Sequence, residues 1–268
     1  MRCLMKNLEI HEERGVEFLF SPLFSDFLFL RHAFSTRRGG MSKEPFRSLN
    51  LGPSEGEDPA HVKENRRRFF EASGMKPTKV VEVKQVHGAK VVNACDIPED
   101  GVVAADGIVT NAPGIFAAVQ TADCLPVLVA DPVKCAVAAV HAGRRGLASG
   151  VLEAVVLRMK ECFESDAENL VAVLGPAISG KCYEVGDECI LPFQQKYLQW
   201  RDFCIPLMGG KWFLDLPQVA RSQLVSAGLS EERIGYTSYC TFSESARFFS
   251  YRRDGSPTGR LLSVIGIV

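Results

Sequence analysis

The sequence has few features that would mark a secreted, membrane-bound or nucleic-acid-binding protein. Its nine cysteines include no Cys-x-x-Cys pair, and an odd, irregularly spaced set favours reduced thiols over a disulfide framework. The formal net charge is -1, so no charged tail or polybasic patch indicates nucleic acid or a membrane surface as a partner. These absences predict a cytoplasmic protein.

Long hydrophobic runs are also absent. Residues 1–13 are interrupted by charged side chains and contain no apolar stretch, so no signal peptide is expected. The apolar segment 16–34 contains acidic residues, a proline and an arginine, which predicts short strands and a turn instead of a membrane span. We therefore expect a soluble chain.

Common nucleotide-binding and deaminase fingerprints are missing as well. Neither Gly-x-Gly-x-x-Gly nor the Walker A motif occurs, so nucleotide binding through either is unsupported. The Pro-Cys-x-x-Cys element that the zinc nucleobase deaminases combine with His-x-Glu is also absent. An enzyme with this sequence must build its site from other residues.

The composition is that of an ordinary globular protein. Hydrophobic residues make up 46% and charged residues 24% of the 268 residues, which is ample for a buried core. No internal repeat, low-complexity block or linker marks a boundary. We therefore expect a single domain over residues 1–268.

Strand-like and helix-like segments follow one another along the chain. Short runs rich in Val, Ile, Leu or Ala predict strands at 80–87, 115–120, 126–130, 135–141, 170–175, 211–214 and 261–268. Apolar residues at helical spacing predict helices at 61–72, 148–163, 187–199 and 217–227, the last with Asp215 as N-cap. The mixture predicts an α/β (α+β) protein with mixed sheets and helices packed outside.

Two histidines and a cysteine stand at or beside the ends of such apolar runs. They are His87, Cys124 and His141, and the chain has five histidines in all. Each residue taken alone is more often part of a core. Two imidazoles and a thiolate are, however, a ligand set that leaves the fourth position of a catalytic zinc open.

A glycine-rich turn follows His141. It leads into a predicted helix, so free backbone N–H groups and the helix dipole favour an anion such as phosphate there, and Arg144 and Arg145 add positive charge. A plain strand-to-helix connection with solvated arginines explains the same turn. Asp123 would point away from Cys124 in a continuing strand, which suits an orienting partner better than a ligand.

Two polar loops are further candidates for the site. Segments 32–52 and 249–260 combine Arg, Ser, Asn and Gly, a combination that often faces a ligand. A charged surface turn has the same composition, so both interpretations stay open.

The chain resembles the YfiH family, also called the laccase-domain or DUF152 family, whose members are described as purine nucleoside phosphorylases. The resemblance runs from about residue 32 to the C-terminus and leaves residues 1–31 outside the strongest match. The motifs that carry it are Ser35-Thr-Arg37, Ser48-Leu-Asn50-Leu-Gly52, Gln85-Val-His87-Gly88, Ala105-Asp106-Gly107, Thr121-Ala-Asp-Cys124-Leu-Pro126, Val140-His141-Ala-Gly143, Gly175-Pro-Ala-Ile178, Cys182-Tyr-Glu184, Leu214-Asp215-Leu216, Cys240-Thr241, Phe249-Ser-Tyr251-Arg252 and Gly259-Arg260.

The resemblance implies a layered α-β-β-α sandwich in which helices cover two mixed sheets. It places zinc on His87, Cys124 and His141. It implies zinc-dependent phosphorolysis of purine nucleosides (adenosine, inosine, guanosine and methylthioadenosine) by inorganic phosphate, together with adenosine deamination.

The substrate-binding residues are predicted from their chemistry. Arg37, Arg144 or Arg252 can hold phosphate, whereas Asn50, Gln85 or Asp123 can form hydrogen bonds with the ribose or the base. The metal can act as a Lewis acid or generate hydroxide near neutral pH. The sequence does not decide which of these steps uses the metal.

Other functions fit parts of the same pattern. A metal-independent cysteine hydrolase would use Cys124 as nucleophile and His87 or His141 as base. A copper polyphenol oxidase, the family's older label, needs on the order of ten histidines for its copper centres, and five are present. A structural zinc would need a fourth ligand such as Cys182.

Overall fold

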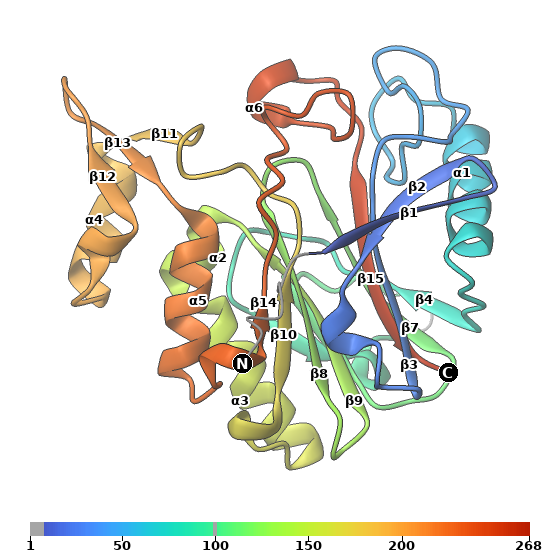
Figure 1. Ribbon diagram of the computed structural model, residues 1–268, viewed down its shortest axis with the longest axis horizontal. Coiled ribbons are helices and arrows are strands. Elements are labelled where there is room, and N and C mark those ends of the chain that lie inside the picture. The colour runs from blue at the N-terminus through green and yellow to red at the C-terminus, as the bar shows by residue number, and fades with distance from the viewer. Residues whose placement is uncertain (1–7, 99–100) are drawn as a thin grey trace.

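Two six-stranded β-sheets packed face to face form the centre of the molecule (Figure 1). The computed structural model describes residues 8–98 and 101–268. The first sheet has the strand order β1-β2-β3-β15-β7-β4. Its strands are β1 (Glu9–Glu13), β2 (Val16–Phe20), β3 (Leu30–Ser35), β15 (Leu261–Ile267), β7 (Ile115–Thr121) and β4 (Lys79–Val81).

The second sheet has the strand order β14-β10-β8-β9-β6-β5. Its strands are β14 (Ile234–Gly235), β10 (Val171–Leu174), β8 (Leu125–Asp131), β9 (Ala136–Ala142), β6 (Gly107–Thr110) and β5 (Val91–Asn93). Each sheet is mixed, since β4 pairs with β7, β5 with β6 and β10 with β14 in parallel while the other neighbours are antiparallel. The expected mixed sheets are confirmed.

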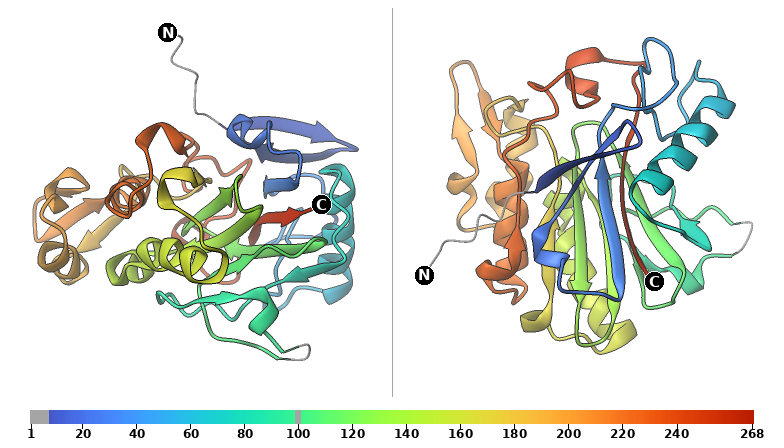
Figure 2. Two further views of the ribbon diagram at one scale, coloured as in Figure 1. Left: turned by 90° about the horizontal axis from the view of Figure 1, so that it is seen from below. Right: turned by 45° about the vertical axis from the view of Figure 1, so that its right-hand side comes forward.

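Helices cover the outer faces of the paired sheets. Helix α1 (Pro59–Ala72) packs through Phe69 on the first sheet, and α3 (Val151–Phe163) and α5 (Leu216–Ser226) pack on the second. In both views of Figure 2, α1 (cyan) lies on one side of the sheets and the orange segments lie on the other. The layered α-β-β-α sandwich is therefore confirmed.

The central strands β8 and β9 are apolar except for Asp131 and His141 near their ends, because both of their faces are covered. In β8, Val127 and Val129 face the helices of the second sheet, while Leu128 and Ala130 face the first sheet. Hydrophobic and polar residues alternate along the strands of a sheet that has one face exposed to solvent. Its absence in β8 and β9 follows from their place between two layers.

A small third sheet lies beside this core, at the left of Figure 1. It contains β11 (Glu184–Gly186), β13 (Lys211–Leu214) and β12 (Cys204–Pro206), and α4 (Asp187–Lys196) follows β11 directly. The remaining helices are α2 (Arg144–Ser149) and α6 (Tyr251–Asp254). The loop that contains α6 rises above the ends of the two sheets in Figure 1.

Two expected elements are wrong in extent. The strand expected over 80–87 is only β4, because pairing with β7 ends at Val81. Lys84 then forms an isolated bridge with Ala104, and the chain bends at His87, which adopts a left-handed φ of 60°. The helix expected over 148–163 begins earlier, at Arg144, and is divided into α2 and α3 by Gly150 at φ 87°. Helix α5 has the predicted cap, since Asp215 accepts a hydrogen bond from the N–H of Gln218 at 2.9 Å.

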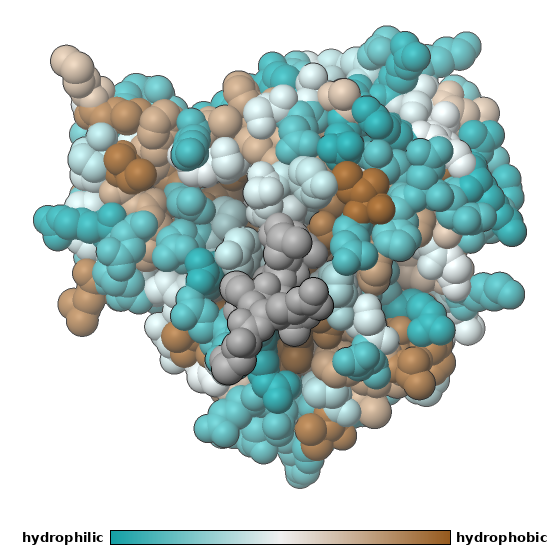
Figure 3. All heavy atoms as spheres, in the orientation of Figure 1, coloured by the Kyte–Doolittle hydropathy of each residue, from teal (hydrophilic) through white to brown (hydrophobic). Residues whose placement is uncertain are grey.

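Hydrophilic side chains cover most of the face shown in Figure 3, where the apolar residues form small separate groups. None of the helices within residues 8–98 and 101–268 has the length and apolarity to cross a bilayer.

Candidate metal centre

The three predicted ligands meet at one point of the structure. The ligand atoms of His87, Cys124 and His141 all lie within 4.8 Å of one another, and the two imidazole rings are close to perpendicular. His87 comes from the loop after β4, Cys124 from the turn between β7 and β8, and His141 from β9. Because Leu125 of β8 pairs with Ala142 of β9, the turn that carries Cys124 is held beside His141.

A fourth residue, Asp106, holds two of these ligands in place. Its buried carboxylate lies 2.8 Å from Nδ1 of His141 and accepts hydrogen bonds from the N–H groups of His87 (2.9 Å) and Gly88 (2.6 Å). A proton on Nδ1 of His141 leaves Nε2 as the free lone pair for a metal. Asp106 belongs to the Ala105-Asp106-Gly107 motif, but no residue pattern on its own assigned it to the site.

Gly143 leaves the space that a bound ion needs. A Cβ atom at this position would lie 3.0 Å from Sγ of Cys124 and 3.1 Å from Cδ2 of His87. A larger residue would therefore crowd the ligand atoms. The donor set of two nitrogens and one sulfur also fits a borderline-soft divalent metal.

The electrostatics of the group favour a thiolate. Burial opposes ionisation of Cys124, but hydrogen bonds from His141 and His87 lower its pKa to about 6. Burial likewise disfavours a charged His141, but the hydrogen bonds to Asp106 and Cys124 raise its pKa to about 9. A deprotonated sulfur is the form that binds a metal.

Cys182 does not complete the group. Within the described residues, the cluster of possible ligands contains two histidines and one cysteine, with no fourth His, Cys, Asp or Glu. A structural zinc usually has four protein ligands. The arrangement therefore matches a centre with an open position.

A cavity of about 530 Å³ adjoins the three ligands. Its size is in the range of small-molecule sites. Its walls come from both sheets, from the segment before β11 and from α6. The lining residues are Gln85, His87, Gln120, Thr121, Ala122, Asp123, Cys124, His141, Tyr183, Tyr251, Arg252 and Arg260.

Besides the three candidate ligands, three other predicted site residues line this cavity, namely Gln85, Asp123 and Arg252, and hydrogen bonds within the protein already engage them. The amide of Gln85 pairs with both backbone groups of Gln120 at 2.8 Å. The carboxylate of Asp123 accepts hydrogen bonds from Oγ1 of Thr241 (2.7 Å) and from the N–H of Arg252 (2.6 Å). Asp123 thus ties the loop of α6 to the turn that carries Cys124.

The side chain of Arg252 is held in the cavity wall by contacts with Glu184 and Tyr183. Its Nη1 donates to the carbonyl oxygen of Glu184 at 2.7 Å, and its guanidinium lies 4.9 Å from the centre of the Tyr183 ring. Arg144 begins α2 and acts on the same tyrosine, because its charge opposes the rise in the pKa of Tyr183 that burial causes. Arg144 itself is not among the lining residues.

Two other predicted substrate-binding residues lie outside the cavity lining. Arg37 donates to the carbonyl oxygens of Arg47 (2.7 Å) and Ser245 (3.0 Å). The fully buried Asn50 donates to Glu57 and accepts from the N–H groups of Gly52 and Arg260. Both side chains hold loops together through these hydrogen bonds.

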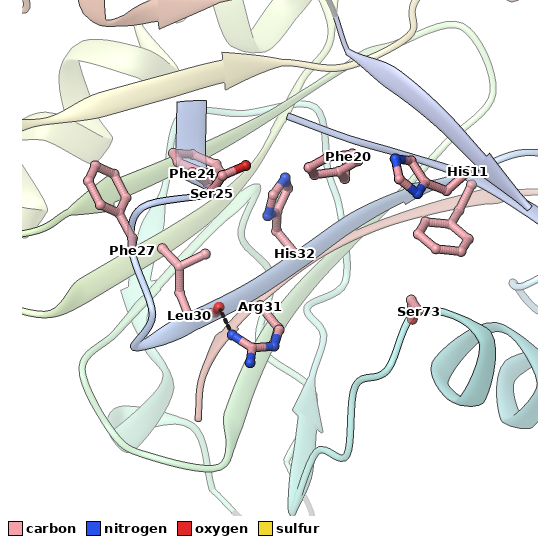
Figure 4. Close-up of a pocket in the computed structure, with 10 residues that line it drawn as sticks. His11, Phe20, Phe24, Ser25, Phe27, Leu30, Arg31, His32 and Ser73 are labelled. Atoms are coloured by element: carbon pink, nitrogen blue, oxygen red, sulfur yellow. Dashed lines mark hydrogen bonds between the residues drawn. The ribbon is translucent and has the colours of Figure 1, made fainter. Parts of the chain in front are cut away.

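A second cavity, of about 310 Å³, is lined mainly by β1, β2, β3 and the turn after β2 (Figure 4). Phenylalanine rings surround His32 there, and Nε2 of His32 accepts a hydrogen bond from the N–H of Ser21 at 2.8 Å. Burial lowers the pKa of His32 to about 3. The two histidines of this cavity, His11 and His32, do not belong to a metal-ligand cluster of the described chain.

The neutral state of His32 predicts acid sensitivity of the fold. Below about pH 6.5 the unfolded chain protonates this imidazole while the folded protein does not, so stability that is complete above pH 6.5 is lost as the pH falls toward 3. The loss is up to about 1.4 kcal/mol per pH unit. Urea unfolding of the wild type and His32→Gln between pH 7 and 5 checks this: the difference between the two free energies should change with pH, and a constant difference contradicts it.

Comparison with known proteins identifies the family. A family model described as "Multi-copper polyphenol oxidoreductase laccase" matches residues 31–268. The chain therefore belongs to this family, the laccase-domain or YfiH family, and it has the family's sandwich fold with a His-Cys-His metal-binding arrangement.

The most informative relatives carry a more specific name. The chain is 44% identical over 234 residues to "Purine nucleoside phosphorylase YfiH" of Escherichia coli (strain K12), covering 87% of this chain and 92% of that one. It is 40% identical over 237 residues to "Purine nucleoside phosphorylase PA4543" of Pseudomonas aeruginosa, covering 88% and 93%.

Solved structures share the whole architecture. The crystal structure of Bacillus licheniformis hypothetical protein YfiH superposes with a TM-score of 0.87 at 31% identity, covering 97% of this chain and 99% of that one. YlmD from Geobacillus stearothermophilus superposes with a TM-score of 0.86 at 32% identity, covering 96% and 97%. The resemblance that the motifs indicated is confirmed.

Proposed function

We propose that this protein is a zinc-dependent purine nucleoside phosphorylase. The observation that carries the proposal is a three-ligand His-Cys-His group beside a cavity that also contains arginine and tyrosine side chains. The names of the relatives at 44% and 40% identity support the same reaction. The substrates are a purine nucleoside and inorganic phosphate.

His87, Cys124 and His141 would hold the zinc, with Asp106 fixing the imidazole of His141. A zinc bound there would supply Lewis-acid polarisation or a bound water of lowered pKa. Asp123 keeps the turn of Cys124 and the loop of α6 in register through its two hydrogen bonds. Asp106 and Asp123 therefore act as positioning residues.

The reaction transfers a ribosyl group. An oxygen of phosphate forms a bond to the anomeric carbon of the ribose while the bond from that carbon to the purine nitrogen breaks. The electron pair of the broken bond leaves with the purine, which takes up a proton as the phosphate loses one. The products are the free base and ribose 1-phosphate.

The remaining lining residues suit the binding of a nucleoside. Tyr183 and Tyr251 offer aromatic surface for a purine, which stacks favourably on such rings. Arg252, held by the carbonyl oxygen of Glu184 and the Tyr183 ring, fixes one wall of the cavity. The loop of α6 contributes Tyr251 and Arg252 to the cavity wall.

The direct test is product analysis with metal-quantified protein. Adenosine, inosine and methylthioadenosine are incubated with and without phosphate, and free base and sugar phosphate are measured. We expect base release that requires phosphate and ends on chelation. Cys135→Ala, a change of an exposed cysteine, serves as the control with unchanged turnover. If the protein turns over none of these purine nucleosides, the proposal is wrong.

The same assay separates the alternatives. Inosine formed from adenosine without phosphate would reveal the deaminase activity that the family resemblance implies. Activity that survives complete metal removal would instead favour the cysteine hydrolase, with Cys124 as nucleophile. The eight described cysteines are free, in keeping with the reducing, cytoplasmic setting proposed for this chain.

A further inference from the structure

One amide oxygen in the wall of the cavity is free to meet a ligand. Gln120 of β7 lines the cavity, and its Nε2 donates to the carboxylate of Glu82 at 2.7 Å. Its Oε1 accepts no hydrogen bond within the described chain and, in contrast to Oγ1 of the neighbouring Thr121, is not buried. The oxygen is therefore an acceptor without a partner at an accessible position of the wall.

The orientation of this amide is fixed by its surroundings. Glu82 takes two hydrogen bonds from Arg66, at 2.6 and 3.0 Å, in addition to the one from Gln120. An ionised carboxylate only accepts hydrogen bonds, so it holds the NH2 group of Gln120 and turns the amide oxygen away from itself. The amide of Gln85 holds both backbone groups of Gln120. Gln120 thus presents a fixed acceptor.

Arg260 lies beside this acceptor and has unused donors. A Cβ atom at Gly52 would lie 2.2 Å from Oε1 of Gln120 and 2.7 Å from Cβ of Arg260, so the two side chains are neighbours over the glycine. Nη1 of Arg260 donates to the carbonyl oxygens of Thr258 (3.0 Å) and Gly259 (3.1 Å). Its Nε and Nη2 have no partner in the described chain and are not buried. Free donors and a free acceptor therefore stand on adjacent side chains.

Both residues lie on the outer face of the first sheet. Gln120 continues the face of β7 that carries Phe116 and Ala118, and Arg260 precedes β15 on the face that carries Leu262. These apolar residues pack in the cluster beneath α1. His141, in contrast, belongs to β9 of the second sheet. Gln120 and Arg260 therefore form an end of the cavity away from His141.

An aromatic ring belongs to the same end. Tyr251 of α6 lines the cavity and is 55% exposed, so much of its ring is free for contact. Burial lowers the pKa of Arg260, and an interaction with Tyr251 is the largest effect that opposes this shift. The two side chains therefore lie close to each other. A ring surface beside a donor and an acceptor suits a flat heterocycle.

The pair of polar groups matches one edge of a purine. Adenosine presents the 6-amino donor beside the acceptor N1, and inosine presents the N1–H donor beside the acceptor O6. Arginine and glutamine are the side chains that commonly read purine edges through paired hydrogen bonds. Phosphate at neutral pH offers mainly acceptor oxygens, so the fixed acceptor of Gln120 would find no partner on it.

We propose that Gln120 and Arg260 form the subsite for the purine base, with Oε1 of Gln120 accepting from the donor at position 1 or 6 and the Arg260 guanidinium donating to the acceptor beside it. This assignment rests on the proposed phosphorylase function and names the residues that recognise the base. Glu82 is then a positioning residue, which fixes the amide of Gln120. The ribose extends toward the candidate metal ligands.

The test compares three nucleosides at saturating phosphate. Gln120→Met should raise the KM for inosine and adenosine about three- to tenfold. The KM for purine riboside, which has no donor on this edge, should change less than about twofold. Arg260→Met should raise the KM for all three nucleosides about ten- to a hundredfold, because each of them offers an acceptor there. The KM for phosphate and the bound metal should change less than about twofold in both variants.

A third variant tests the orientation of the amide without changing the cavity lining. In Glu82→Gln the partner can donate as well as accept, so the amide of Gln120 can turn over. The KM for inosine and adenosine should rise about two- to fivefold while that for purine riboside stays unchanged. A loss of stability alone would not produce this dependence on the base. Gln195→Met and Arg201→Met, at exposed positions, are the matched controls and should keep every KM.

A calorimetric titration with inosine in the absence of phosphate needs no turnover. Binding to the metal-loaded protein should weaken in Gln120→Met and Arg260→Met by the same factors as the KM, and the two control variants should bind as the wild type does.

The outcomes distinguish the two proposals. A phosphorylase in which Gln120→Met raises the KM for purine riboside as much as that for inosine, or in which Arg260→Met raises the KM for phosphate instead, overturns the base subsite alone. Absence of phosphorolysis in the wild type overturns the function, and the titration with inosine then decides the subsite. Weaker binding in Gln120→Met than in Gln195→Met supports it, and equal binding in these two variants or no binding to the wild type overturns it.

Discussion

Replacement of Cys124 by serine is expected to empty the metal site and abolish turnover. A serine hydroxyl does not ionise near neutral pH, so the group loses its only anionic ligand, whereas the thiol of Cys124 has a pKa of about 6. We expect the bound metal to fall from about one per chain to less than about one tenth. Turnover should fall by on the order of a thousandfold or more.

Metal analysis after gel filtration, together with the phosphorolysis assay, checks this expectation. Cys135→Ser, in an exposed turn, is the matched control and should retain both metal and turnover. The measurement also tests the cysteine hydrolase hypothesis. If Cys124 were only a nucleophile, its replacement would abolish turnover without loss of bound metal. A fully loaded, inactive Cys124→Ser protein would contradict the assignment of Cys124 as a ligand.

Asp106→Asn is expected to weaken metal binding without removing any ligand. The asparagine amide has one acceptor oxygen, whereas the Asp106 carboxylate serves His141 and the N–H groups of His87 and Gly88. Loss of such an outer partner typically lowers metal affinity about ten- to a hundredfold. A buried N–H group left unpaired costs roughly 1–3 kcal/mol of stability besides.

Asp131→Asn is the control for the effect on stability. Asp131 is also fully buried and accepts hydrogen bonds from two backbone N–H groups, those of Val133 and Lys134, at the end of β8 that carries no metal ligand. Both variants should lower the free energy of unfolding, but only Asp106→Asn should lower the metal affinity in a chelator competition. Equal affinities in the two variants would show that Asp106 has no positioning role.

Local patterns in the sequence were enough to find the long elements. The buried strands β7, β8, β9 and β15 were predicted within a few residues, as was the cap of α5 at Asp215, because continuous apolar runs and a capping carboxylate are local signals. Strands β1, β5, β6, β11, β12 and β14 were missed. They have two to five residues each, too few for a periodic pattern, and exist only through their neighbours.

The three candidate ligands were also found from local sequence, since each stands at the margin of an apolar run in a chain with five histidines. Their partners were not. Asp106 follows only a short apolar run, Val102 to Ala105, that was not predicted to be a strand. It is connected to His141 because β6 pairs with β9. Arg260 was visible as a motif residue and Gln120 as the end of a predicted strand, but nothing in the sequence tells that both line the cavity with unpaired polar atoms.

The sequence by itself determined the fold class and the three residues of the candidate metal centre, because hydrophobic patterning and ligand chemistry are properties of single segments. The tertiary structure decided which polar residues surround the cavity. Asn50 and Arg37 are held by loop contacts, whereas Arg260 and Gln120 line the cavity. Whether a polar residue is held in a loop or lines the cavity depends on hydrogen bonds between segments that are far apart in the chain. These hydrogen bonds form only when both sheets have formed.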